Sequence, residues 1–164
     1  MAATYEPIAT TTLGSNTASV TFSSIAATYT DLVLVTSVQN NSGGNRVMQI
    51  ILNADTATNY SGTYLTGDGT SATSGRSSSV AYLDTFATVP GASFAVCIFN
   101  VQNYANTTTF KTVISRSGAA ATNARTAASL WRSTSAINSI KFQLGGADLY
   151  STGSTFTLYG IKAA

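Results

Sequence analysis

The sequence predicts an all-β protein, an antiparallel sandwich of two packed sheets. Apolar segments are short, about four to nine residues, and clusters of Gly, Asn, Ser or Thr bound them, as in sandwiches and barrels. Helical periodicity is almost absent, and no repeat of fixed period indicates a solenoid or propeller. At 164 residues the chain has the size of one domain. We therefore expect one sandwich domain over residues 8–164.

The boundaries of the apolar runs give the expected strands in chain order. Turn signals separate several of them, including an Asn- and Gly-rich cluster at 40–45, Gly-Asp-Gly at 67–69 and Pro-Gly at 90–91. About ten strands suffice for two sheets. We expect strands at 8–13, 18–22, 31–38, 47–53, 61–66, 78–84, 93–101, 110–116, 127–132, 139–144 and 155–161.

Two patterns indicate how these strands lie. The segments 140–144 and 156–161 alternate, with Ile140, Phe142 and Leu144 on one side, so each places one face in the core. The runs 32–35 and 95–99 are instead apolar at successive positions, as in central strands covered on both faces. The opposite sheet covers one face, and either a loop or a neighbouring subunit covers the other.

The remaining segments are expected to be irregular. Residues 71–79 are poor in apolar side chains and predict a long exposed loop, as do residues 117–123. The alanines at 119–121 are also compatible with one helical turn. Residues 1–7 precede the first expected strand and contain Tyr5 and Pro7. We expect an N-terminal arm that contacts a neighbour through Tyr5, or else a frayed end.

The composition favours an assembly component. Charged residues make up 9% of the chain, against about 25% in an average soluble protein, and Ser and Thr make up roughly three in ten. Low charge leaves little repulsion between copies. The net charge is +2, and the eight Lys and Arg residues are scattered, without the clustering that nucleic-acid binding requires. We therefore expect no nucleic-acid partner.

Other sequence features indicate cellular setting. Cys97 is the single cysteine, so no intrachain disulfide forms, and its apolar run predicts a buried thiol. No apolar run reaches the roughly 18 residues of a membrane span, and the N-terminus lacks the pattern of a signal peptide. We expect a soluble protein made in a cytoplasm, without a membrane partner.

No enzyme motif is present. The chain has no histidine, which excludes Ser-His-Asp and Cys-His hydrolysis and most zinc sites. A glycosidase would need two of the six acidic residues to converge, yet most lie at predicted turns or strand ends. Asn53, Asp55 and Asn59, or alternatively Asp68, offer oxygen ligands without the spacing of a calcium loop, so turns are preferred. We predict no catalytic, cofactor-binding or metal-binding residues.

Aromatic residues leave sugar binding open. Sugar rings stack on exposed aromatic faces, and the chain has eight tyrosines and one tryptophan. Most lie beside apolar strand residues, where buried rings are commoner. If a glycan binds, Tyr104 and Trp131 are the candidate contacts.

Three segments carry a family resemblance. Asn-Ala-Asp-Thr-Ala-Thr-Asn-Tyr-Ser at 53–61 resembles an Asn-Gly-Asp-Thr-Gly-x-Asn-Tyr-Ser segment of small virion proteins from tailed bacteriophages. Tyr-Thr-Asp-Leu-Val-Leu at 29–34 resembles the start of a core strand in those proteins, and 154–161 resembles their closing strand. Here Ala54 and Ala57 replace glycines, which predicts a turn without positive φ at these positions.

The resemblance implies a jelly-roll-like sandwich of about eight to ten strands in a phage particle. One implied role is a capsid decoration, or cement, protein that binds the major capsid protein and its own copies, often as a trimer, and stabilises the head. The alternative is a tail-fibre or spike domain that binds a host glycan. Small size and the lack of a fibrous stem favour decoration. Either role implies location in the virion after assembly in the host cytoplasm.

Overall fold

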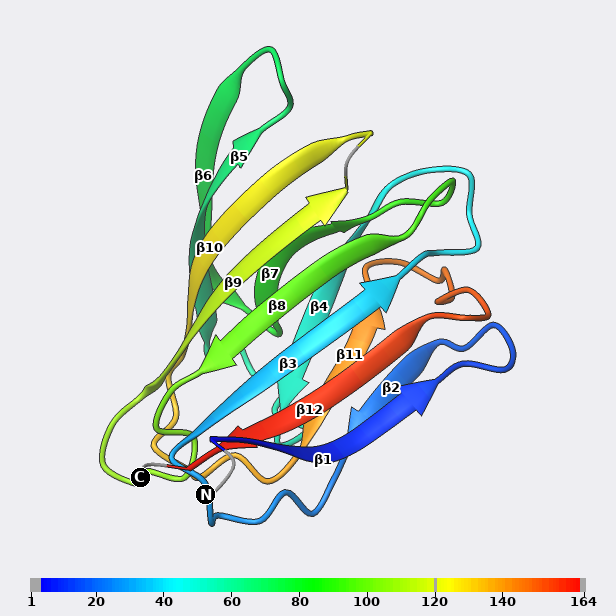
Figure 1. Ribbon diagram of the computed structural model, residues 1–164. Helices are drawn as coiled ribbons and strands as arrows, with labels where there is room; N and C mark the ends of the chain where they lie inside the picture. Colours follow the sequence, from blue (N-terminus) through cyan, green and yellow to red (C-terminus); the bar gives the residue numbers. More distant parts are fainter. Residues whose placement is uncertain (1–3, 120, 163–164) are drawn as a thin grey trace.

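The structure, a computed structural model, describes residues 4–119 and 121–162. These residues form twelve strands and no helix, and all strand pairs are antiparallel, as predicted (Figure 1). The strands are β1 (Tyr5–Thr12), β2 (Ser19–Phe22), β3 (Asp31–Val38), β4 (Arg46–Leu52), β5 (Tyr60–Gly67), β6 (Ala72–Val80), β7 (Leu83–Val89), β8 (Ala95–Val101), β9 (Lys111–Ala119), β10 (Asn123–Trp131), β11 (Ile140–Leu144) and β12 (Thr155–Ile161).

The strands form two sheets that pack face to face. The larger sheet has the order β1-β12-β3-β8-β9-β10-β5-β6, and the smaller has the order β2-β11-β4-β7. Without β5, β6, β9 and β10, the two sheets have four strands each, and the chain passes from one sheet to the other in the order of a jelly roll. The predicted jelly-roll-like sandwich is thus confirmed, with two inserted hairpins.

The inserted strands form a wing, defined here as β9, β10, β5 and β6. They extend the large sheet beyond β8, and the β5–β6 hairpin stands furthest from β1 (Figure 1). The inner face of the wing packs over β7, which is the outermost strand of the small sheet. The wing therefore covers an edge that the jelly roll alone would leave open.

The core lies between the sheets and follows the predicted alternation. Ile140, Phe142 and Leu144 are all buried and face the large sheet, while Lys141 and Gln143 are half-buried on the other side of β11. β3 and β8 are adjacent in the middle of the large sheet, as their continuous apolar runs predict. Burial of these side chains is the main source of the fold's stability.

Some elements differ from prediction. The expected loop at 71–79 is wrong, because Ala72–Val80 is β6 and pairs along its length with β5. The expected strand at 78–84 is also wrong, because β6 ends at Val80, β7 begins at Leu83, and the chain turns at 81–82 between them. At 117–123, strand β9 continues to Ala119 and β10 begins at Asn123, while residue 120 lies outside the described residues.

The N-terminal segment is only partly visible. Residues 1–3 of the expected arm lie outside the described residues. Tyr5 and Pro7 already belong to β1, where Tyr5 pairs with Ile161 and a bulge follows Pro7. The edge position of β1 explains how the sheet tolerates a proline without an N–H group.

Candidate interaction surface

The 53–61 loop is fixed to the body of the protein by Asn53. Its side-chain amide donates to the carbonyl of Ala136 at 2.7 Å. Its side-chain oxygen accepts from the backbone N–H groups of Asn138 and Ser139, at 2.8 and 3.1 Å. Asn53 thus joins the end of β4 to the segment that leads into β11.

Asp55 forms the second attachment of this loop. Its carboxylate accepts hydrogen bonds from the indole N–H of Trp131 at 2.7 Å, from Asn59 at 3.0 Å and from the backbone of Ala57 at 2.9 Å. Burial raises the pKa of Asp55, but these hydrogen bonds outweigh it and hold the pKa below its usual value. The carboxylate is therefore a structural acceptor for the wing residue Trp131.

Tyr60 and Arg132 complete the attachment. The Tyr60 hydroxyl donates to the Asp55 carbonyl at 2.9 Å, its ring stacks on Trp131, and burial raises its pKa to about 12. Arg132 donates to the carbonyls of Thr58 and Tyr60 and to the hydroxyl of Ser61. The residues that carry the family resemblance therefore hold the wing to the jelly roll.

One expectation about this loop is wrong. Asn53 and Ala54 both have positive φ, at +51° and +56°, so Ala54 occupies the left-handed region that favours glycine. Ala57 is not in that region. Ala54 is therefore a strained residue in this turn.

The aromatic candidates for ligand contact divide into buried and exposed. Trp131 is buried with its N–H bonded to Asp55, and Tyr104 is buried with its hydroxyl bonded to the carbonyl of Ala26. In this structure neither ring presents a face on which a sugar could stack. Tyr5 is 56% exposed and contacts Tyr159 edge to face, so it remains a predicted partner contact.

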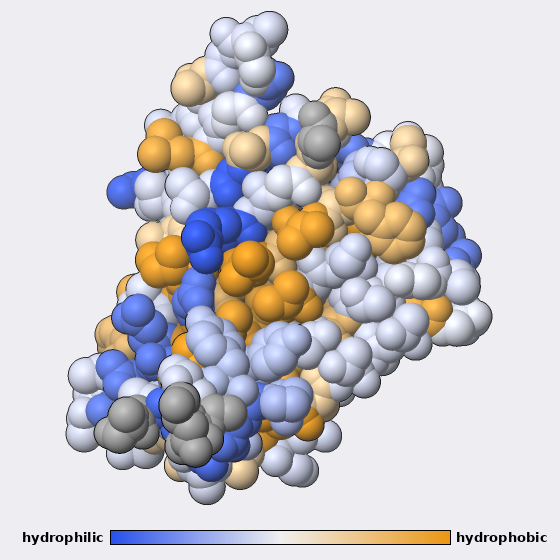
Figure 2. All heavy atoms as spheres, viewed as in Figure 1, coloured by the Kyte–Doolittle hydropathy of each residue, from blue (hydrophilic) through white to orange (hydrophobic). Residues whose placement is uncertain are grey.

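The outer face of the large sheet, the side turned away from the small sheet, is the most distinctive surface. Apolar side chains gather at its centre over neighbouring strands (Figure 2). Val35 pairs with Ile98, and Val96 and Ile114 are 51% and 38% exposed. Leu65 of the wing is 58% exposed on the same face. The sequence predicted a second cover over β3 and β8, and within the described residues this face stays partly exposed.

Few charges lie on the outer face. The exposed guanidinium groups belong to Arg116 of β9 and Arg76 of β6. Asp31 stands at the start of β3, where it already accepts a hydrogen bond from the backbone of Asn103 at 2.7 Å. The centre of the outer face is therefore apolar with a basic character.

The opposite side of the sandwich, the outer face of the small sheet, is more polar. Gln143 of β11 donates to Gln49 of β4 at 3.1 Å, and Lys141 stands on the same side. Val47 is the exposed apolar residue of β4, at 36%. The contrast between the two sides singles out the large sheet as the candidate interaction surface.

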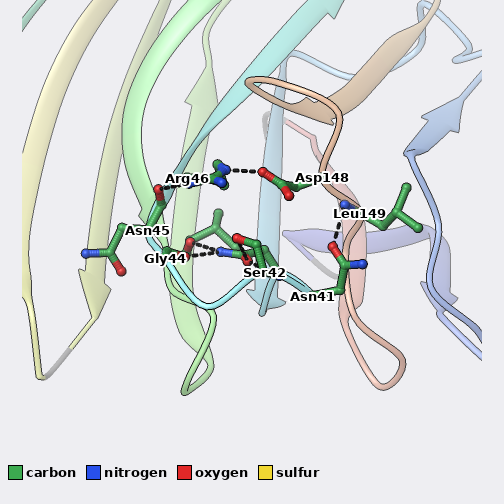
Figure 3. A network of polar contacts seen from close by, with 9 residues as sticks. Asn41, Ser42, Gly44, Asn45, Arg46, Asp148 and Leu149 are labelled. Carbon is green, nitrogen blue, oxygen red and sulfur yellow. Dashed lines mark hydrogen bonds and ion pairs between the residues drawn. The ribbon is translucent and has the colours of Figure 1, made fainter.

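The loops at one end of the sandwich form a polar network (Figure 3). Arg46 at the start of β4 pairs with Asp148 after β11, and the side chain of Asn41 accepts from the backbone of Leu149 at 2.9 Å. Asn40 donates to the carbonyls of Gly44 and Val89. These side chains form their polar contacts within the network, so the network fixes the loops and positions the strands.

Other site chemistry is limited. Asp68 accepts four hydrogen bonds from the backbone and hydroxyls of Thr70 and Ser71, which closes the β5–β6 turn and lowers the pKa of its carboxyl group. No cluster of three potential metal ligands occurs among residues 4–119 and 121–162. No helix long and apolar enough to cross a membrane occurs in the same part of the chain.

Comparisons with known proteins add little. No protein-family model and no curated protein matches the chain. Among solved structures, a protein of unknown function from Shewanella oneidensis MR-1 is 13% identical, with a TM-score of 0.25 over 98% of this chain and 71% of that one. A TM-score this low carries no argument about fold or function.

Proposed function

We propose that this chain is a structural component of a bacteriophage virion, a capsid decoration protein that binds the head and stabilises the shell. The observation that carries the proposal is the apolar outer face of the large sheet, where Val96, Ile114 and Leu65 are exposed. Exposed apolar side chains gathered on one sheet face are typical of protein interfaces. The resemblance of residues 53–61 to phage virion proteins is the reason for proposing a phage particle as the binding partner.

The size of the outer face is suitable for a stable contact. Eight strands about 4.8 Å apart and about 25 Å long give a surface of roughly 900 Å². A standard protein interface buries about 800 Å² on each partner. One sheet face is therefore enough to hold the protein on a particle without a further domain.

Charge indicates which partner the outer face suits. Two copies placed face to face would bring basic faces together, with Arg116 and Arg76 on each and the Asp31 carboxylate already bonded. Like charges in a desolvated interface are unfavourable. The outer face is therefore better suited to a different protein that offers apolar surface with acidic groups, and we assign that role to the major capsid protein.

The proposal is tested with particles assembled without this chain. Added protein should label the head in electron micrographs and raise the temperature at which the heads disrupt. Val96→Asp on the outer face should abolish both effects, because it buries an unpaired charge in the contact. Val47→Asp, on the small sheet, is the matched control and should bind like the parent protein.

Labelling confined to the tail would overturn decoration and favour the alternative, a tail-fibre or spike domain. That alternative lacks the two expected stacking rings, since Tyr104 and Trp131 are buried. The assigned face would be wrong if the protein bound both head and tail and if Val96→Asp and Val47→Asp reduced this binding equally. Particle reconstruction would also count the copies at each site, where the resemblance implies three.

A further inference from the structure

The two sheets of the protein have four edge strands, and three of them are protected. An edge strand with free backbone groups is a template for pairing with another chain, so proteins shorten, kink, charge or cover it. The edges are β1 and β6 in the large sheet and β2 and β7 in the small one. β2 is protected by its length, since it has four residues.

β1 is protected by its sequence. Pro7 has no N–H to donate, and the register shifts between Pro7 and Ala9. Glu6 and Lys162 form an ion pair of 2.9 Å beside the same strand. Proline, a bulge and charges are common means of preventing edge pairing.

β7 is protected by the wing. Three successive carbonyls of β7 accept hydrogen bonds from side chains on the inner face of the wing. They are Asp84 from Ser129 at 2.9 Å, Thr85 from Ser115 at 3.4 Å and Phe86 from Arg125 at 2.7 Å. A partner strand would find these acceptors already occupied.

β6 is the least protected of the four edges. Its bulge lies near its end, at Ser79, and residues 72–78 pair in regular register with β5. It is nine residues long, contains neither proline nor an acidic residue, and Arg76 is its single charge. Among the residues that the structure describes, no side chain hydrogen-bonds to its backbone, and most of its residues are exposed. Its free backbone groups are therefore available to another strand.

The turn before β6 shows which backbone groups face outward. The backbone N–H of Asp68 donates to the carbonyl of Ser71 at 3.2 Å, so these two residues are a hydrogen-bonded pair. Such pairs alternate along an antiparallel ladder. Ser74 and Arg76, which lie opposite Leu65 and Thr63, are therefore non-bonded positions and direct their N–H and C=O groups away from β5.

We propose that β6 pairs with β6 of a second copy, antiparallel about a two-fold axis at Gly75. This register places Ser74 of each copy opposite Arg76 of the other, and the outward backbone groups of both residues find partners. It also keeps the two Arg76 side chains from facing each other, since like charges directly opposite are destabilising. The inference does not depend on the proposed function, and its two-fold dimer differs from the trimer that the family resemblance implies.

Gly75 suits the axis position. The two Gly75 residues would form a non-bonded pair, where the Cα atoms of antiparallel strands approach most closely, at about 4.5 Å. A Cβ at this position would also lie 2.8 Å from the Tyr64 ring on the other side. Glycine therefore permits close approach on both sides of the strand.

The pairing has a consequence for docking. A two-fold axis perpendicular to the sheet joins two large sheets into one and leaves both outer faces on the same side. A dimer would then present two apolar faces to one surface. Paired faces bind more tightly than single ones, because the second contact is intramolecular.

The test is the mass of the protein in solution with charges placed at Ser74. The parent chain should sediment at twice its 16.9 kDa monomer mass. Ser74→Lys places a cation beside Arg76 of the other copy and should return the mass to that of the monomer. Ser74→Glu places an anion there and should keep the dimer, with a dissociation that increases with salt.

Two controls distinguish the β6 contact from unfolding and from pairing through another edge. Ser74 is exposed, so both variants should unfold at the temperature of the parent protein when all three are dilute enough to be monomeric. Thr12→Lys, at an exposed position of the β1 edge, should leave the dimer unchanged. A parent chain that stays monomeric at high concentration, a trimer unaffected by Ser74→Lys, or equal effects of Lys and Glu would each overturn the proposal.

Discussion

The hydroxyl of Ser129 in β10 donates a 2.9 Å hydrogen bond to the main-chain carbonyl of Asp84 in β7, which joins the wing to the edge of the small sheet. Ser129 is 2% exposed and Asp84 is half-buried, so the hydrogen bond is largely shielded from water. A strand edge normally bonds to another strand, but here a side chain from the facing sheet takes that place. The wing thus covers β7 and at the same time provides hydrogen-bond donors for its polar groups.

We predict that Ser129→Ala destabilises the fold by about 1–2 kcal/mol, because it leaves the partly buried Asp84 carbonyl without its donor. Ser115→Ala removes a longer contact of 3.4 Å to Thr85 and should cost less. Urea unfolding measures both free energies. Equal losses, or none in Ser129→Ala, would contradict an edge held by this hydrogen bond.

Much of the sandwich was predictable because a strand with one buried face alternates apolar and polar residues along the sequence. The expected strands at 31–38 and 155–161 match β3 and β12, and the alternation of 140–144 identified the inward face of β11. β6 was not predictable in this way. It is a polar edge strand that contributes backbone pairing and few buried side chains, so its residues carry no apolar pattern.

The interaction surface was partly predictable. The run at 95–99 indicated a strand that needs a second cover, and Val96 is exposed where that cover is missing. The contacts of the 53–61 loop could not be predicted, because Trp131 is 76 residues from Asp55 and only the fold brings them together. Burial of Tyr104 and Trp131 likewise depends on packing from distant strands.

Ala54→Gly should stabilise the protein by about 0.5–1 kcal/mol. Ala54 has a φ of +56°, which glycine adopts without the clash of a Cβ, and this gain exceeds the greater freedom of glycine in the unfolded chain. Ala57→Gly is the matched control, since Ala57 lacks positive φ and its replacement should be neutral or destabilising. Thermal unfolding of both variants decides between these outcomes.

Asp55→Asn should cost about 1–3 kcal/mol at neutral pH, because the charged acceptor of the Trp131 N–H is lost. The folded pKa of Asp55 is below its unfolded value, so its contribution is present above about pH 4 and lost as pH falls through the folded pKa. Unfolding measured from pH 7 to about pH 3 should show the difference between the two proteins shrinking. A difference that is independent of pH would contradict the ionised acceptor.

Cys97 should resist thiol reagents until the protein unfolds. It is fully buried in β8, and burial raises the pKa of its thiol to about 12. The rate of labelling by a disulfide reagent should therefore increase with urea along the unfolding curve. Fast labelling of the native protein would show that β8 opens locally.

Lys111→Met should change how stability depends on alkaline pH. Lys111 is completely buried at the start of β9, where its ammonium group donates to the carbonyls of Thr109 and Thr134 at 2.9 and 3.2 Å. Desolvation lowers its pKa below the ordinary lysine value. The unfolded chain therefore binds more protons than the folded one between the two pKa values, and the lysine's contribution to stability rises with pH in that window.

The parent protein should gain relative to Lys111→Met as pH rises from neutral toward about 10. Burial raises the pKa values of Tyr60 and Tyr104, which has the opposite effect on stability at alkaline pH, but both proteins share those residues. The difference between the two unfolding free energies thus isolates the lysine. A difference that stays constant over this range would mean that Lys111 keeps its proton equally well in the folded and unfolded states.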